Sequence, residues 1–176
     1  MTTVTKEPCP TVTASCALLG QCRTFLQSID TDHYTTPSQR LMGSTIGQHV
    51  RHSLDHYAAA LSALEGRIID YDHRARKTHI ESECTAAIAQ IDTLSSQIES
   101  IAADAMASDV TIRVMLSAEG ETADLRSTLA REFAFATHHA IHHCAMMASI
   151  ASELGQSIPE GFGKAPSTRN YERTGA

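Results

Sequence analysis

The stretch Thr137-His138-His139-Ala140-Ile141-His142-His143 contains four of the ten histidines of the chain within seven residues. Its surroundings are rich in Ala and Leu and poor in Gly and Pro, which favours a helix. Residues four apart on a helix lie on one face, one turn from each other. The stretch therefore offers two pairs, His139–His143 and His138–His142, at the spacing that binds zinc in metal-binding helices.

The two pairs lie on different faces of the predicted helix, because His138 is about 100° away from His139. The face that carries His139 and His143 is otherwise apolar or small. Its other members are Ala136, Met146 and Ile150. We therefore predict that His139 and His143 are metal ligands and that His138 and His142 are flanking or supporting residues.

A second histidine cluster, His49-Val50-Arg51-His52-Ser53-Leu54-Asp55-His56, lies in a helix predicted from Ser44 to Leu64 and capped by Gly66. The bulky apolar stripe of this helix is centred about 120° from the histidines. The side with the histidines carries small residues, which is typical of a helix that lines a cavity. A third ligand is expected from His49, His52 or His56, and the helical wheel places His49 and His56 deeper than His52.

The predicted ligands define the chemistry of the site. Imidazole suits Zn, Ni, Cu or Fe. Three histidines leave a coordination position open, as in catalytic rather than structural zinc sites, and a water bound there can become a nucleophile. Glu132 falls on the same side of its helix as His139 and could orient an imidazole or accept a proton. A plain helix-start glutamate that complements the dipole is the alternative interpretation.

The rest of the chain predicts an all-α protein, a four-helix bundle with a short β-hairpin between its third and fourth helices. The hairpin is indicated by the alternating residues 109–116 and a turn at 118–121. One domain is expected over residues 1–176, with a core at about 10–155 and an irregular C-terminal tail at 156–176. The predicted helices begin at Thr11, Ser44, Ile80 and Ser127 and end near Asp30, Leu64, Met106 and Leu154.

Composition narrows the functional classes. The net charge of −6 and scattered basic residues, with one short run at Arg74-Ala75-Arg76-Lys77, argue against nucleic-acid binding. No apolar stretch is long enough for a membrane span, and residues 1–7 lack the layout of a secretory signal, so we expect a cytoplasmic protein. Five irregularly spaced cysteines fit reduced thiols.

The two histidine clusters resemble the metal motifs of the DinB-like (DinB/YfiT) superfamily. Thr45-Ile46-Gly47-Gln48-His49-Val50-Arg51-His52-Ser53-Leu54-Asp55 is similar to its first motif. His139-Ala140-Ile141-His142-His143-Cys144-Ala145-Met146 is similar to its second. The resemblance implies a four-helix bundle with one nickel or zinc ion and, residue by residue, a triad of His52, His139 and His143. Two departures are Ser44, where the family often has Trp, and the apolar residues after His143.

The resemblance implies a metal-dependent enzyme that activates a water or a low-molecular-weight thiol for attack on a small electrophilic substrate. This reaction would be of the hydrolase or thiol S-transferase type, and no catalytic residue beyond the ligands is predicted. One alternative is a metal-binding or stress-response bundle without turnover. Another is a bundle whose histidines only pack an interface, and the apolar helix faces also allow a homodimer.

Overall fold

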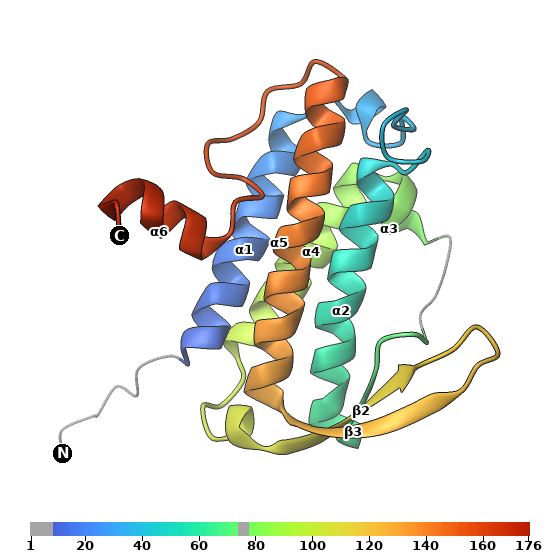
Figure 1. Ribbon diagram of the computed structural model, residues 1–176, viewed down its shortest axis with the longest axis vertical. Coiled ribbons are helices and arrows are strands. Elements are labelled where there is room, and N and C mark those ends of the chain that lie inside the picture. The colour runs from blue at the N-terminus through green and yellow to red at the C-terminus, as the bar shows by residue number, and fades with distance from the viewer. Residues whose placement is uncertain (1–8, 74–77) are drawn as a thin grey trace.

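The computed structural model describes residues 9–73 and 78–176, and its long helices run side by side as a bundle (Figure 1). The N-terminal segment and the basic run at 74–77 lie outside the described residues. In chain order the elements are α1 (Pro10–Ser28), a 3-10 turn (Thr31–His33), α2 (Ile46–Gly66), β1 (Ile68–Asp70), α3 (His79–Ser82), α4 (Cys84–Glu99), a 3-10 turn (Ala105–Ala107), β2 (Asp109–Met115), β3 (Thr122–Thr128), α5 (Leu129–Glu153) and α6 (Pro166–Thr174).

The bundle consists of α1, α2, α4 and α5, and its core is mainly aliphatic. α2 packs against α5, and α1 packs against both α4 and α5. Four aromatic side chains are fully buried among the aliphatic ones, so the core contains aromatic rings although the chain has no Trp. They are Phe25, Tyr34, Tyr57 and Phe133.

Helix α2 is fixed firmly at its start. The Thr45 hydroxyl accepts a hydrogen bond from the Gln48 amide, and the Gln48 side chain accepts one from the Thr45 amide. This capping box satisfies two amides that the helix itself leaves open. At the other end, Arg67 rather than Gly66 adopts the left-handed cap conformation, with φ of +61°. The start predicted from Ser44-Thr45 is confirmed, and the predicted glycine cap is wrong by one residue.

The helix predicted from Ile80 to Met106 is interrupted and shorter. α3 and α4 are separated at Glu83, which is extended, and α4 ends at Glu99. In a continuous helix the carbonyl of Ile80 would accept from the amide of Cys84. Here the Ile80 carbonyl accepts instead from the hydroxyl of buried Tyr34, at 2.6 Å. A tertiary contact thus accompanies the break.

The predicted hairpin is present as β2 and β3, and it belongs to a three-stranded sheet. β2 pairs with β3 in antiparallel register, with Ile112 opposite Leu125. β1, which the sequence did not predict, pairs with β2 in parallel register, with Ile69 opposite Ile112. The chain passes directly from β3 into α5, so the sheet sets where α5 begins.

The segment after α5, predicted to be irregular, contains α6 and a buried anchor. The ring of Phe162 stacks on that of Phe25 in α1, with centroids 4.3 Å apart. α6 then stands away from the bundle beside α1 (Figure 1), and none of its residues is buried.

None of the described helices is both long and apolar enough to cross a membrane. The five cysteines are free. Cys22 of α1 and Cys144 of α5 are buried with their sulfur atoms 3.3 Å apart.

Candidate metal centre

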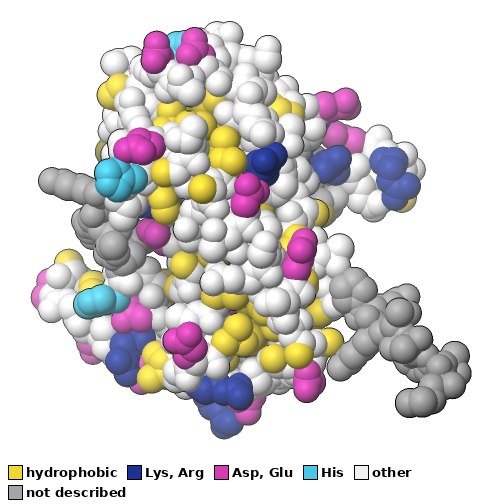
Figure 2. Space-filling model, turned by 180° about the vertical axis from the view of Figure 1, so that it is seen from behind, with side chains coloured by type: hydrophobic (Ala, Val, Ile, Leu, Met, Phe, Trp, Pro, Cys, Tyr) yellow, Lys and Arg dark blue, Asp and Glu magenta, His cyan; other side chains and the backbone are white. Residues whose placement is uncertain are grey.

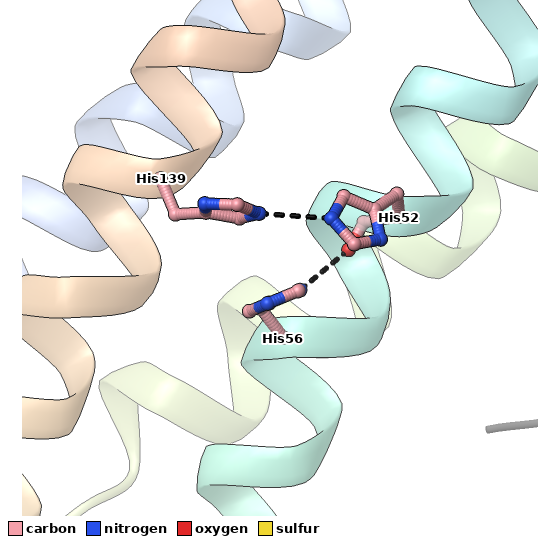
Figure 3. A group of neighbouring side chains, drawn as sticks. All are labelled: His52, His56 and His139. Carbon is pink, nitrogen blue, oxygen red and sulfur yellow. Dashed lines mark hydrogen bonds between the residues drawn. The ribbon is translucent and has the colours of Figure 1, made fainter. Parts of the chain in front are cut away.

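Two neighbouring helices, α2 and α5, bring five histidines together where they pack against each other. His52 and His56 project from α2 toward His139 of α5 (Figure 3). His49 lies one turn before His52 on α2, and His143 lies one turn after His139 on α5. Since α2 and α5 pack against each other, histidines separated by more than eighty residues become neighbours.

Short distances join the Nε2 atoms of three of these rings. His52 Nε2 lies 2.9 Å from His139 Nε2, and His139 Nε2 lies 3.2 Å from His143 Nε2. Two nitrogens that ligate one ion at about 2.0–2.1 Å are themselves about 3 Å apart. These separations suit nitrogens that share an ion, and they also suit N–H···N hydrogen bonds between the rings.

His56 contributes a fourth nitrogen to the same region. Its Nδ1–H donates to the carbonyl oxygen of His52, at 2.9 Å. In the neutral ring, Nε2 therefore carries the lone pair. One donor atom each from His52, His56 and His139 can be chosen so that all lie within 4.8 Å of one another.

A hydrogen-bond chain from Ser44 through His49 orients the ring of His143 through its Nδ1 atom. The Ser44 hydroxyl donates to the carbonyl of Leu41, so it must accept from His49 Nε2–H, at 3.0 Å. His49 Nδ1 then has the lone pair and accepts from His143 Nδ1–H, at 2.9 Å. This chain leaves Nε2 as the basic nitrogen of His143, and it is the kind of outer hydrogen bond that orients metal-ligating histidines.

The environment keeps His143 neutral. Burial, reinforced by His52 and His139, lowers its pKa to about 3. Burial, with a smaller effect of His142, also lowers the pKa of His49. An unprotonated imidazole is the form that binds a metal. The two rings are therefore ready to act as ligand and supporting base at neutral pH.

Two aromatic rings complete one side of the cluster. Tyr71, from the segment after β1, stacks on His56 with ring centroids 5.0 Å apart. Phe135, one turn before His139 on α5, stacks on His139 at 5.7 Å and is 37% exposed. The guanidinium of Arg131 lies 5.6 Å from the centroid of the Phe135 ring. This side therefore combines an exposed apolar ring with a nearby positive charge.

Solved structures share this arrangement of helices. A DinB-like protein from Bacillus subtilis, YjoA, superposes with a TM-score of 0.63 and 14% identity over 86% of this chain and 97% of its own. This chain has the DinB-like fold. A second solved structure, YfiT from Bacillus subtilis, superposes with a TM-score of 0.58 and 13% identity over 86% of this chain and 95% of its own. It is described as a probable metal-dependent hydrolase with an unusual four-helix bundle topology. The predicted fold is thus confirmed.

Comparison with protein sequences finds one partial match. No protein-family model matches the chain. "FK506-binding protein 5" of Rhizopus delemar is 31% identical over 105 residues, which is 59% of this chain. The match spans only 27% of the length of that protein.

On the DinB-like fold, the predicted ligands and both alternates occupy one cluster. His52, His139 and His143 are neighbours, and their role as ligands stays a prediction. His56 is a further candidate ligand, and His49 lies behind His143 rather than among the shortest Nε2 contacts. The flanking residues His138 and His142 are exposed, which fits their predicted positions.

Glu132 lies at the start of its helix, as the helix-start interpretation predicts, and it is also linked indirectly to the histidines. It is fully buried, in the first turn of α5. Its carboxylate accepts hydrogen bonds from the Tyr71 hydroxyl at 2.8 Å, the Ser127 hydroxyl at 2.6 Å and the Arg131 guanidinium at 2.8 Å. Tyr71 in turn stacks on His56, so Glu132 is connected to the histidines only indirectly, through its hydrogen bond with Tyr71.

Several supporting residues escaped the sequence analysis. Phe135 had a usable signal, because it precedes His139 by four residues and shares its face. Ser44 was noted only as a departure from the family pattern. The contact of Tyr71 with His56 is a tertiary one, and Tyr71 directly follows β1, which pairs with β2 of the hairpin.

Proposed function

We propose that this protein binds one divalent transition-metal ion through His52, His139 and His143 and is a metal-dependent enzyme. The observation that carries the proposal is the approach of their Nε2 atoms. That of His139 lies 2.9 Å from that of His52 and 3.2 Å from that of His143. Without an ion, these imidazole nitrogens would have to serve one another as hydrogen-bond partners, although His143 is buried and His52 and His139 are half-buried. Metal binding gives these nitrogens a common partner.

The donors favour particular metals. Neutral imidazole nitrogens suit zinc, nickel, copper and iron, whereas magnesium and calcium require oxygen ligands. We propose zinc or nickel. His56, whose Nε2 carries its lone pair, competes with His143 as the third ligand or adds a fourth.

A divalent ion held by three imidazoles supplies a Lewis acid with an open position, which lowers the pKa of a bound water or thiol. The protein's own groups orient the ligands and shape the approach. The Ser44–His49 chain holds the ring of His143, and Phe135 offers an apolar surface beside His139. We propose a small electrophilic substrate with attack by water or by a low-molecular-weight thiol.

Hydrolysis and thiol transfer are the two reaction types that this arrangement supports. The structural neighbour YfiT is described as a probable metal-dependent hydrolase, which favours water as the nucleophile. Glu132 is an unsuitable general base because it is fully buried and already accepts three hydrogen bonds. Because Glu132 is not available as a general base, we keep a second candidate function, a metal-binding bundle without turnover.

Metal analysis and two probe reactions test the proposal. Natively purified protein is expected to contain about one zinc or nickel ion per chain, and His139→Ala to contain none. p-Nitrophenyl acetate probes attack by water, and 1-chloro-2,4-dinitrobenzene with a low-molecular-weight thiol probes thiol transfer. Turnover of either should be lost with chelator and restored by metal. Stoichiometric metal without turnover would favour the second candidate, and no bound metal in either protein would overturn both.

A further inference from the structure

A cavity lies away from the histidines, between the bundle and α6. Its volume is about 420 Å³, and it is lined from one side by α1 and α5 and from the other by residues 164–173. Thr137 and Ile141, which α5 contributes, are separated from the His139 face by about 200° of helical rotation. The cavity is therefore distinct from the candidate metal centre.

The bundle forms a mostly apolar floor for this cavity. α1 contributes Ala14, Ala17 and Leu18 together with the polar Gln21, and α5 contributes Ile141 and Thr137. The alanines keep this part of α1 shallow, so space remains where a larger side chain would fill it. A volume of this size falls within the range of small-molecule pockets, at about 300–1,000 Å³.

The opposite wall is cationic. Arg169 and Arg173 are four residues apart on α6, so they share one face, and both line the cavity. Lys164 also lines it, but Glu172 lies within 2.6 Å of its ammonium and neutralises it. Among the described residues, no carboxylate forms an ion pair with Arg169 or Arg173. Figure 2 shows dark blue side chains gathered on the projecting segment that carries α6.

The cationic wall is tied to the bundle by the residues that precede it. Phe162 is buried and stacks on Phe25 of α1. Gly163, with φ of +76°, passes so close to α5 that a Cβ atom there would lie 2.7 Å from the backbone of Ala145. Only glycine fits this approach. The rim of the cavity is therefore a built part of the fold.

We propose that this cavity binds a small amphipathic organic carboxylate, with its head group at Arg169 and Arg173 and its apolar tail on Ala14, Ala17, Leu18 and Ile141. Guanidinium groups recognise carboxylates through paired, charge-assisted hydrogen bonds. The floor carries no charged group, and apart from the uncharged Gln21 and Thr137 its side chains are aliphatic, which favours an aliphatic or aromatic tail. The proposal is independent of whether the metal centre is catalytic.

Calorimetric titration with octanoate tests both halves of the proposed ligand. We expect saturable binding with a Kd on the order of 0.1 mM, given the modest affinity per atom of small ligands. Acetate, which lacks the tail, and octanamide, which lacks the charge, should each bind at least about tenfold more weakly. Inorganic phosphate that bound as tightly as octanoate would overturn the role of the apolar floor.

Variants locate the binding at this cavity. Arg169→Ala/Arg173→Ala should weaken octanoate binding by about tenfold or more, and Ala17→Phe should block it by filling the floor. Arg113→Ala, which removes one exposed arginine from the hairpin, and His139→Ala, in the metal centre, should leave it unchanged. Circular dichroism checks that each variant is folded. No saturable binding to the wild type, or equal binding to the double variant, would overturn the proposal.

Discussion

The Nε2 atom of His52 on α2 lies 2.9 Å from the Nε2 atom of His139 on α5. This contact joins the two helices that pack most closely around the candidate metal centre, and both proposed sets of ligands include it. We predict that His139→Ala reduces bound metal from about one ion per chain to none. The matched control, His138→Ala, removes an exposed histidine from the preceding position and should retain full metal content in elemental analysis.

The third ligand can be identified by comparing His143→Ala with His56→Ala. If His143 is the ligand, its replacement should lower metal affinity by at least about 100-fold and change the visible spectrum of the Co²⁺-substituted protein. His56→Ala should then retain that spectrum with a smaller loss of affinity. The reverse pattern would assign the ligand role to His56, and loss of the spectrum in both variants would indicate a four-histidine site.

The hydrogen-bond chain behind His143 predicts an effect on metal affinity without loss of a ligand. Ser44→Ala and His49→Gln should each weaken binding by about 10–100-fold, the usual range for groups that orient ligating histidines. The Co²⁺ spectrum should keep its shape, because the ligands remain. Ser62→Ala, which removes a hydroxyl bonded to the Ala59 carbonyl on the same helix, serves as the control. Unchanged affinity in both variants would contradict the role of the chain.

Glu132→Ala should destabilise the metal-free protein. The change removes a buried carboxylate and deprives the hydroxyls of Tyr71 and Ser127 of their acceptor. A loss of about 3 kcal/mol in the free energy of unfolding is expected in urea titrations. Asp92→Ala, which breaks an exposed ion pair with Arg23, should cost less than about 1 kcal/mol. Similar effects of both variants would show that the buried network contributes little.

The metal-free protein should also lose stability as the pH falls below neutral. Burial and neighbouring histidines lower the pKa of His143 from 6.5 to about 3. The unfolded chain therefore takes up a proton near pH 6.5, whereas the folded chain resists protonation until about pH 3. Stability is full above about pH 6.5 and declines toward pH 3. Chelator-treated His143→Gln should show a shallower decline between these values, and an equal slope would contradict this assignment.

The sequence predicted the elements whose signals are local and repeated. The apolar periodicity of α2 and α5 and the Thr45 cap gave the two helices that carry the histidines. The alternation of β-branched residues from Val110 gave the hairpin. These signals work because the period of a helix or strand repeats in every turn or pair of residues.

Elements that depend on distant contacts were missed. β1 has three residues, too few for a period, and exists by pairing with β2. The break at Glu83 accompanies the hydrogen bond that Tyr34 donates to the Ile80 carbonyl. The position of the segment before α6 depends on Phe162 stacking against Phe25, 137 residues earlier in the chain. None of these contacts leaves a pattern in neighbouring residues.

The sequence by itself determined that histidines recur four apart on two helices, because spacing along a helix fixes which side chains share a face. Only the tertiary structure decided which nitrogens meet. The packing of α2 against α5 brings His52 to His139, places His49 behind His143 and adds His56 to the candidate ligands. The physical reason is that packing throughout the core sets how each helix is turned about its own axis. If α2 or α5 were turned differently, other histidines would face the neighbouring helix.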